Sequence, residues 1–296
     1  MGRRTKNQGK RTKPARGAWW RSLEPAWRRS LLIGGAKILA LAVGGLAAGL
    51  GLSRLDAHVG ERLLDDPSRP ELTFIDLPPV VERLGGADLA AVTSDLLDQP
   101  WTDPRLCPAM GERLTGTGWI ARLNFVRRTG DRRFEVSARY RVPVAMVQQD
   151  RQFLLIDPDG VRLPGAYFHE PRWKLIQGVR AAPPAPGEAW PGEDLQAALR
   201  LLAAVSPEPF EPQISGVIVE NYAGRVAAER SHVELATDRP EGRIRWGSAP
   251  GLEVEENTVG QKLAILRANF QRTGRADAGH AVIDISTFPD RFTVSP

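Results

Sequence analysis

Residues that could do chemistry are few and scattered in this sequence. Its four histidines are His58, His169, His232 and His280, and they stand far apart. The sequence has no His-Glu-x-x-His motif of a zinc protease and no Gly-x-Ser-x-Gly nucleophile elbow. His169-Glu170 has the residue types of a general-base site, but such a pair is more often part of a surface loop. We therefore assign no catalytic residue, and the sequence favours a binding protein over an enzyme.

Metal and redox sites also have little support. Asp157 and Asp159 are carboxylates that could ligate calcium, but the segment 157–160 lacks the spaced acids of an EF-hand and has the composition of a tight turn. Cys107 is the single cysteine, which excludes an internal disulfide and a multi-cysteine zinc or iron–sulfur site. Next to Leu106 it is expected to act as a small core residue. We predict no metal site and no cofactor.

The charge of the chain is divided unevenly along its 296 residues. Residues 1–29 hold ten Lys/Arg and one acid, Glu24, for a net charge of +9. The remaining 267 residues hold 30 basic and 34 acidic groups, for a net charge of −4. A broad nucleic-acid-binding face on the main part of the protein is therefore not expected.

An apolar run follows the basic tail directly. Residues 31–52 carry one charged side chain, Lys37, and a helix of this length would extend about 33 Å, enough to cross a bilayer core of about 30 Å. A buried soluble helix and a cleaved signal peptide are the alternatives, but the run is long for either. We expect an uncleaved signal anchor with residues 1–30 as a cytoplasmic tail, 53–70 as a linker, and the rest outside the cytoplasm.

Small residues recur every four positions along this span. They are Ala36, Ala40, Gly44 and Ala48. Such spacing allows two helices to approach closely, so weak self-association through this face is one hypothesis. Gly and Ala are also common in membrane spans that do not associate.

Strand and helix patterns organise residues 71–142 as a first domain. A strand at 72–77 precedes a helix that Asp88 is expected to cap and that continues to Leu97. A second helix follows Asp103. The remaining predictions are strands at 119–126 and 133–140, joined by a turn at 129–131. The order β-α-α-β-β predicts a three-stranded sheet with both helices on one face.

Residues 143–296 read as a larger, mostly antiparallel β domain with two helices, so the fold class is α+β. The predicted helices cover 195–205 and 259–270, and 181–191 is a proline-rich loop. The predicted strands cover 153–156, 161–164, 173–179, 214–220, 226–228, 233–236, 243–246, 281–286 and 292–294.

With these segments placed, the chain resembles the FtsQ/DivIB family of bacterial division proteins. In that family a short cytoplasmic tail and one span precede a POTRA domain and a β domain. The stretches that carry the resemblance are 118–128, 134–145, 154–161, 244–247, 262–266 and 283–285. Some positions depart from the family pattern: Arg139 and Arg141 flank Tyr140 where Glu-Arg is usual, and Ser286 replaces the arginine of the last strand motif.

The resemblance implies a scaffold without catalytic activity in the inner membrane at the division septum. It also implies that an FtsB/FtsL-like coiled-coil pair adds a strand to the exposed C-terminal edge of the β domain. The implied partner-binding residues are Ile283, Asp284, Ile285, Ser286, Thr287, Phe288 and Phe292. On this basis, proline at Ile285 should impair partner capture. The alternative is that 281–286 is an internal strand and the two phenylalanines seal the core.

Two other function classes stay open at this point. One is an anchored extracytoplasmic enzyme, which a deep pocket with converging titratable side chains would favour. The other is an export or assembly chaperone that uses the POTRA part, which a POTRA repeat or barrel-forming strands would favour.

Overall fold

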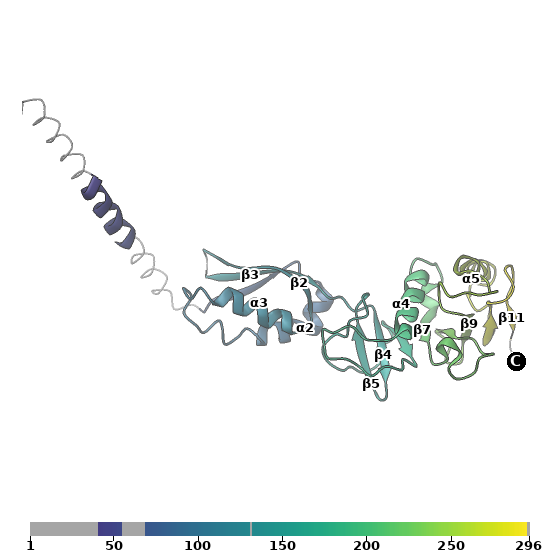
Figure 1. The fold of residues 1–296 in the computed structure, drawn as a ribbon. Helices are drawn as coiled ribbons and strands as arrows, with labels where there is room; N and C mark the ends of the chain where they lie inside the picture. Colours follow the sequence, from purple (N-terminus) through teal and green to yellow (C-terminus); the bar gives the residue numbers. More distant parts are fainter. Residues whose placement is uncertain (1–40, 55–68, 131, 295–296) are drawn as a thin grey trace, which may run out of the picture. The chain divides into compact units, whose positions relative to one another are not determined.

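The structure is a computed structural model that describes residues 41–54, 69–130 and 132–294. The chain forms two compact units, Met1–Ser68 and Arg69–Pro296. In the first, residues 41–54 form a helix with exposed side chains, drawn in purple in Figure 1. Residues 1–40 and 55–68, which include the predicted tail, the first ten residues of the predicted span and most of the predicted linker, lie outside the described residues.

Within residues 41–54, 69–130 and 132–294, no helix is both long enough and apolar enough to cross a bilayer. The part of the predicted span that is described, 41–52, is helical throughout.

The predicted β-α-α-β-β order is confirmed at the start of the second unit. Its elements are β1 (Glu71–Ile75), α2 (Pro79–Ala91), α3 (Leu106–Gly116), β2 (Ile120–Thr129) and β3 (Arg133–Tyr140). The sheet has the order β1-β3-β2, with β1 parallel and β2 antiparallel to the central β3. Both helices lie on the same side of this sheet in Figure 1.

The predicted start of the first helix at Asp88 is wrong. Helix α2 begins nine residues earlier because Pro79 takes the first helical position, where the missing N–H of proline costs nothing. Asp88 lies inside the helix, and its carboxylate accepts a hydrogen bond from the Trp119 indole at 3.3 Å. Position 85 of the same helix requires glycine, since a Cβ on Gly85 would lie 2.3 Å from the Trp119 ring.

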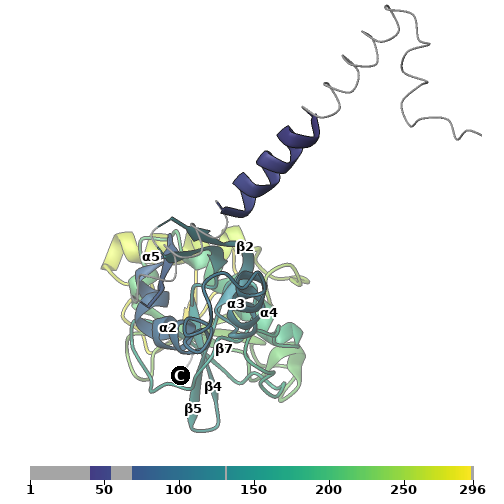
Figure 2. The same cartoon turned by 90° about the vertical axis from the view of Figure 1, so that its left-hand side faces the viewer.

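The larger sheet is mixed: in the described residues four of its strand pairings are antiparallel and three are parallel, which is more parallel pairing than predicted. Its eight strands have the order β11-β10-β9-β8-β7-β6-β4-β5, and β4·β6, β6·β7 and β9·β10 are parallel. The bounds are β4 (Ala145–Gln149), β5 (Gln152–Ile156), β6 (Lys174–Gln177), β7 (Ile214–Ile218), β8 (Val233–Thr237), β9 (Arg243–Gly247), β10 (Val282–Asp284) and β11 (Thr293–Val294). The hairpin of β4 and β5 is seen at full length in Figure 2.

Three local predictions for this sheet need correction. Strand β4 was not predicted, because its first three residues are all buried and show no alternation. Residues 226–228 form no strand and belong to a loop that Asn221 holds through its side-chain amide. Residues 161–164 make isolated bridges to β5 and to Ala189 instead of a continuous return strand.

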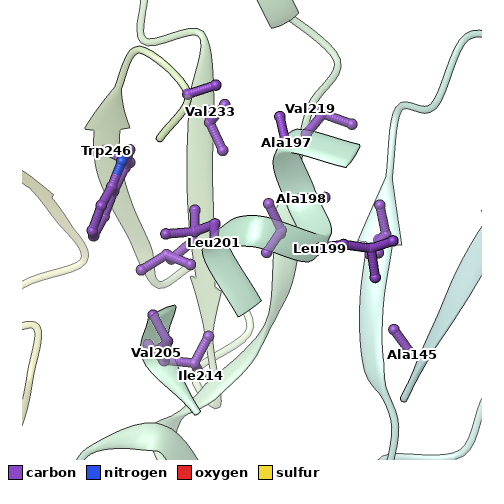
Figure 3. Close-up of a cluster of buried hydrophobic side chains, with 14 of the residues drawn as sticks. Ala145, Ala197, Ala198, Leu199, Leu201, Val205, Ile214, Val219, Val233 and Trp246 are labelled. Carbon is purple, nitrogen blue, oxygen red and sulfur yellow. The ribbon is translucent and has the colours of Figure 1, made fainter. Parts of the chain in front are cut away.

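Both predicted helices of the larger part are confirmed, and both supply side chains to its main core. Helix α4 covers Glu193–Val205, and helix α5 covers Val259–Thr273. Leu201 and Val205 of α4 meet Ile214, Val233 and Trp246 of the sheet in the buried cluster of Figure 3. Helix α5 starts with a reciprocal capping box and ends at a left-handed glycine.

Candidate docking edge

The two ends of the eight-stranded sheet differ in how they are covered. At one end, the outer side of β5 forms bridges from Phe153 to Tyr167 and from Ile156 to Arg162. At the other end lies β11, and within residues 69–294 no strand pairs with its outer side. The C-terminal strand is therefore the uncovered edge of this sheet.

Strand β10, which contains Ile283 and Asp284 of the predicted partner-binding residues, is internal. It pairs in parallel with β9 and antiparallel with β11. Ile283 and the following Ile285 are fully buried in the main core. The resemblance implied docking at 283–285 and the residues that follow them; in the structure 282–284 is an internal strand, and the next strand, β11, is the edge of the sheet.

Proline in place of Ile285 would not test a free sheet edge, because the Ile285 backbone is already paired inside the sheet. The Ile285 N–H donates to the Arg245 carbonyl oxygen at 3.2 Å, so it faces β9 and the interior of the sheet. A proline at this position would break the β9–β10 pairing and lose a buried side chain. A failure to bind a partner would then report loss of structure, not loss of a free edge.

The chain that leaves β10 is held by one buried asparagine. The Asn257 amide donates to the Ile285 carbonyl oxygen at 2.8 Å and to the Phe288 carbonyl oxygen at 2.6 Å. The Asn257 backbone N–H donates to the Ser286 carbonyl oxygen at 2.7 Å. Asp284 completes this arrangement because its carboxylate accepts hydrogen bonds from the Ser286 N–H and hydroxyl. Residues 284–288 are therefore fixed on their inner side.

The remaining predicted site residues divide into exposed and half-buried ones. Thr287 is exposed, and Phe288 is 38% exposed with the Arg291 guanidinium 4.5 Å from its ring centre. Phe292 packs against the main core, and its ring lies 5.6 Å from the His280 ring. Phe288 thus has the exposure of a surface anchor, whereas Phe292 closes the core at the edge.

Helix α5 carries a buried lysine whose burial was not predicted from the sequence. Lys262 of α5 is fully buried and donates to the Glu256 carboxylate at 3.0 Å, with its ammonium 5.3 Å from the Trp246 ring centre. Burial alone would raise the pKa of Glu256, but the Ser248 N–H and the Lys262 ammonium outweigh it and lower that pKa. The Glu256–Lys262 pair fixes the start of α5 against the end of β9.

A groove of about 650 Å³ opens beside these residues. It lies between the loops 222–232 and 247–256, and Asp284 and Thr287 line one end. The exposed side chains of Leu252 and Val254 belong to its lining. The groove is thus adjacent to the C-terminal end of β10.

The other candidate residues from the sequence are not brought together. The Asp157 carboxylate is buried and bonded to Arg141 and to backbone N–H groups of its own turn, so it has a structural partner. The His169 ring makes a tilted contact with the Phe153 ring, and Cys107 lines a surface groove between α3 and β2. Among residues 41–54, 69–130 and 132–294, no group of three His, Cys, Asp or Glu side chains is placed to hold a metal ion.

His58 and half of the predicted self-association face fall in the undescribed part. Ala36 and Ala40 lie outside the described residues, whereas Gly44 and Ala48 lie on the helix 41–54 with exposed side chains. A Cβ at Gly44 would meet no atom within 4 Å.

No family model matches this chain, and no curated protein matches it.

Proposed function

We propose that the chain is a non-enzymatic, membrane-anchored scaffold of the FtsQ/DivIB type that docks other division proteins through the C-terminal edge of its larger sheet. The observation that carries the proposal is the uncovered edge at β11, at the end of the sheet formed by the last strands of the chain. The β-α-α-β-β unit followed by a larger mixed sheet supports the same resemblance.

Docking at such an edge follows from backbone chemistry. An edge strand presents N–H and C=O groups that have no partner within the sheet, and an incoming extended segment can satisfy them. Side chains next to the edge then add affinity and specificity. Here Phe288 is an exposed aromatic residue five positions before β11, and the groove at Leu252 and Val254 is also lined by Asp284, which pairs with β11.

The proposal includes a membrane anchor at 31–52 with the basic tail in the cytoplasm. The sequence supports this anchor in two ways: the run 31–52 has one charged residue, and residues 1–29, which precede it, have a net charge of +9. The main part would then lie outside the cytoplasm at the division septum, with an FtsB/FtsL-like coiled-coil pair as partner.

Photo-crosslinking in cells tests this proposal. A benzophenone amino acid in place of Phe288 should form an adduct with a small single-pass coiled-coil protein of the division site. The matched control is the same substitution at Phe168, an aromatic residue that is 92% exposed and lies in a different loop. The chain without crosslinked partner should also remain in the membrane pellet after carbonate extraction. Equal adducts at both positions, or none at Phe288, would contradict edge docking, and extraction into the supernatant would contradict the anchor.

A further inference from the structure

Strand β11 is attached to the sheet by very few contacts. It pairs with β10 at two positions, Ile283 with Val294 and Asp284 with Thr293. In antiparallel pairs, positions that exchange both backbone hydrogen bonds alternate with positions that exchange none. Ile285 directs its N–H toward β9, so the alternation leaves Asp284 as the residue that faces β11. In the described residues, one residue pair therefore supplies the strand hydrogen bonds that hold β11.

The side chains of β11 add little to this hold. Thr293 and Val294 are both exposed, and Val294 retains 53% of its accessible surface. The packing of this segment comes from the preceding residue, Phe292, which lies against the main core and beside His280. The segment 292–294 thus occupies the sheet as a short peptide ligand would: one aromatic ring in a recess and one strand pair.

The anchoring of the preceding chain makes this segment separable from β10. The Asn257 side chain and backbone hold the chain at Ile285, Ser286 and Phe288. Beyond Phe288, residues 289–291 are exposed. Departure of 292–294 would therefore leave β10 paired with β9 and its exit fixed by Asn257.

We propose that the partner strand docks by displacing β11 and pairing with 282–284 in its place. This inference rests on the proposed function and specifies how its edge is used. A strand added outside β11 would pair with two exposed residues that are themselves weakly held, whereas β10 is anchored in the core by Ile283 and Ile285. The partner that fits is an extended segment, antiparallel to β10, with an aromatic residue followed by two β-branched residues, as in Phe292-Thr293-Val294.

The proposal makes β11 an internal competitor of the partner. A tethered segment competes at an effective concentration of about millimolar for a short flexible connection. Such a competitor weakens apparent binding by one plus its effective concentration divided by its own Kd, so a segment with a Kd of about 0.1 mM makes a chain that ends at Pro289 bind a strand ligand about tenfold more tightly than the full chain does, a difference of about 1.4 kcal/mol.

The first experiment uses the chain's own sequence as the probe. A fluorescent peptide of residues 290–296 is titrated by anisotropy into the chain that ends at Pro289 and into the full chain. Displacement predicts saturable binding to the shortened chain, about tenfold weaker binding to the full chain, and at least tenfold weaker binding of a Phe292→Ala peptide. Equal binding to both chains, or equal binding of both peptides, would overturn it.

A covalent lock keeps the proposal testable if the shortened chain does not fold. In a full chain with Cys107→Ser, the pair Asp284→Cys and Thr293→Cys joins β10 to β11, because opposite residues of a hydrogen-bonded pair have Cα atoms about 5.5 Å apart, within the disulfide range of about 4.4–6.8 Å. The probe is the host's FtsB/FtsL-like pair, co-expressed. Capture only after reduction supports displacement.

The other outcomes separate this inference from the proposed function. Capture by the oxidised and reduced forms alike overturns displacement and leaves strand addition at β11 in place. Capture by neither form, with the unlocked chain as a control that also fails, overturns the proposed function and the displacement that rests on it.

Discussion

Replacing Asn257 with alanine should weaken the larger sheet and release the chain that leads to its edge. The Asn257 side chain is 4% exposed, and it donates to the carbonyl oxygens of Ile285 and Phe288. A buried carbonyl left without a donor costs about 1–3 kcal/mol, and the partly buried Phe288 carbonyl should cost less because water can reach it. The free energy of unfolding should therefore fall by roughly 2–4 kcal/mol.

Urea denaturation of the full chain in a mild detergent measures this loss. Tryptophan fluorescence suits the assay because Trp190 and Trp246 are buried in the main core. The matched control is Asn124→Ala, since the Asn124 amide donates to the Ser137 hydroxyl at an exposed site. That change should stay within about 0.5 kcal/mol. A loss at Asn257 no larger than this control would refute the reasoning that this side chain holds the exit of β10.

Two further substitutions test the packing of the two sheets. Gly85→Ala should destabilise the domain of residues 71–142 by about 1–3 kcal/mol in thermal unfolding, because its Cβ would lie 2.3 Å from the Trp119 ring. Gly86→Ala on the same helix should be neutral or slightly stabilising, because its Cβ would make only an ordinary contact with Glu82 Cγ at 3.8 Å. Equal effects would be inconsistent with the close packing. Lys262→Met should cost about 3–5 kcal/mol at pH 7, because it leaves the Glu256 carboxylate without its cation. Because folding lowers the pKa of Glu256, the ionised carboxylate stabilises the folded chain above the ordinary value of 4.5, and this contribution is lost as the pH falls through the lowered pKa. The difference in unfolding free energy between the unsubstituted chain and Lys262→Met should therefore shrink from pH 7 to pH 3. A constant difference would contradict this assignment.

The domain of residues 71–142 was predictable because its signals are local. The alternation at 133–140 and the turn before it identify the hairpin of β2 and β3, and the apolar spacing after Asp103 identifies α3. The prediction of a helix start at Asp88 was wrong because an acid before an apolar run is typical of a helix start. In the structure the helix starts at the proline pair 78–79.

The parallel strand pairings of the larger sheet could not be predicted from such local patterns. Alternation along a strand is the same for parallel and antiparallel neighbours, so it does not identify the partner strand. The parallel pairing of β4 with β6 and of β6 with β7 joins segments separated by long connections. Strand β4 itself begins with three buried residues, which removes the alternation that would mark it.

The candidate site was predictable in position but not in detail. The sequence placed the last strands of the chain together, and the structure separates an internal β10 from an edge strand β11. The Asn257 side chain reaches residues 28 and 31 positions further along the chain, a contact that no periodic pattern encodes. Neither does any pattern show that Lys262 is buried, since lysine at a helical position is usually exposed.

Hydrogen exchange of the full chain, with and without the co-expressed FtsB/FtsL-like pair, tests the central claim most directly. Edge docking predicts that the partner adds protection to amides between 281 and 294, at the C-terminal end of the larger sheet. The strand β2 provides the internal comparison, because it forms an edge of the smaller sheet. Unchanged exchange at 281–294 with new protection at 120–129 would contradict the claim and place the docking surface on the domain of residues 71–142 instead.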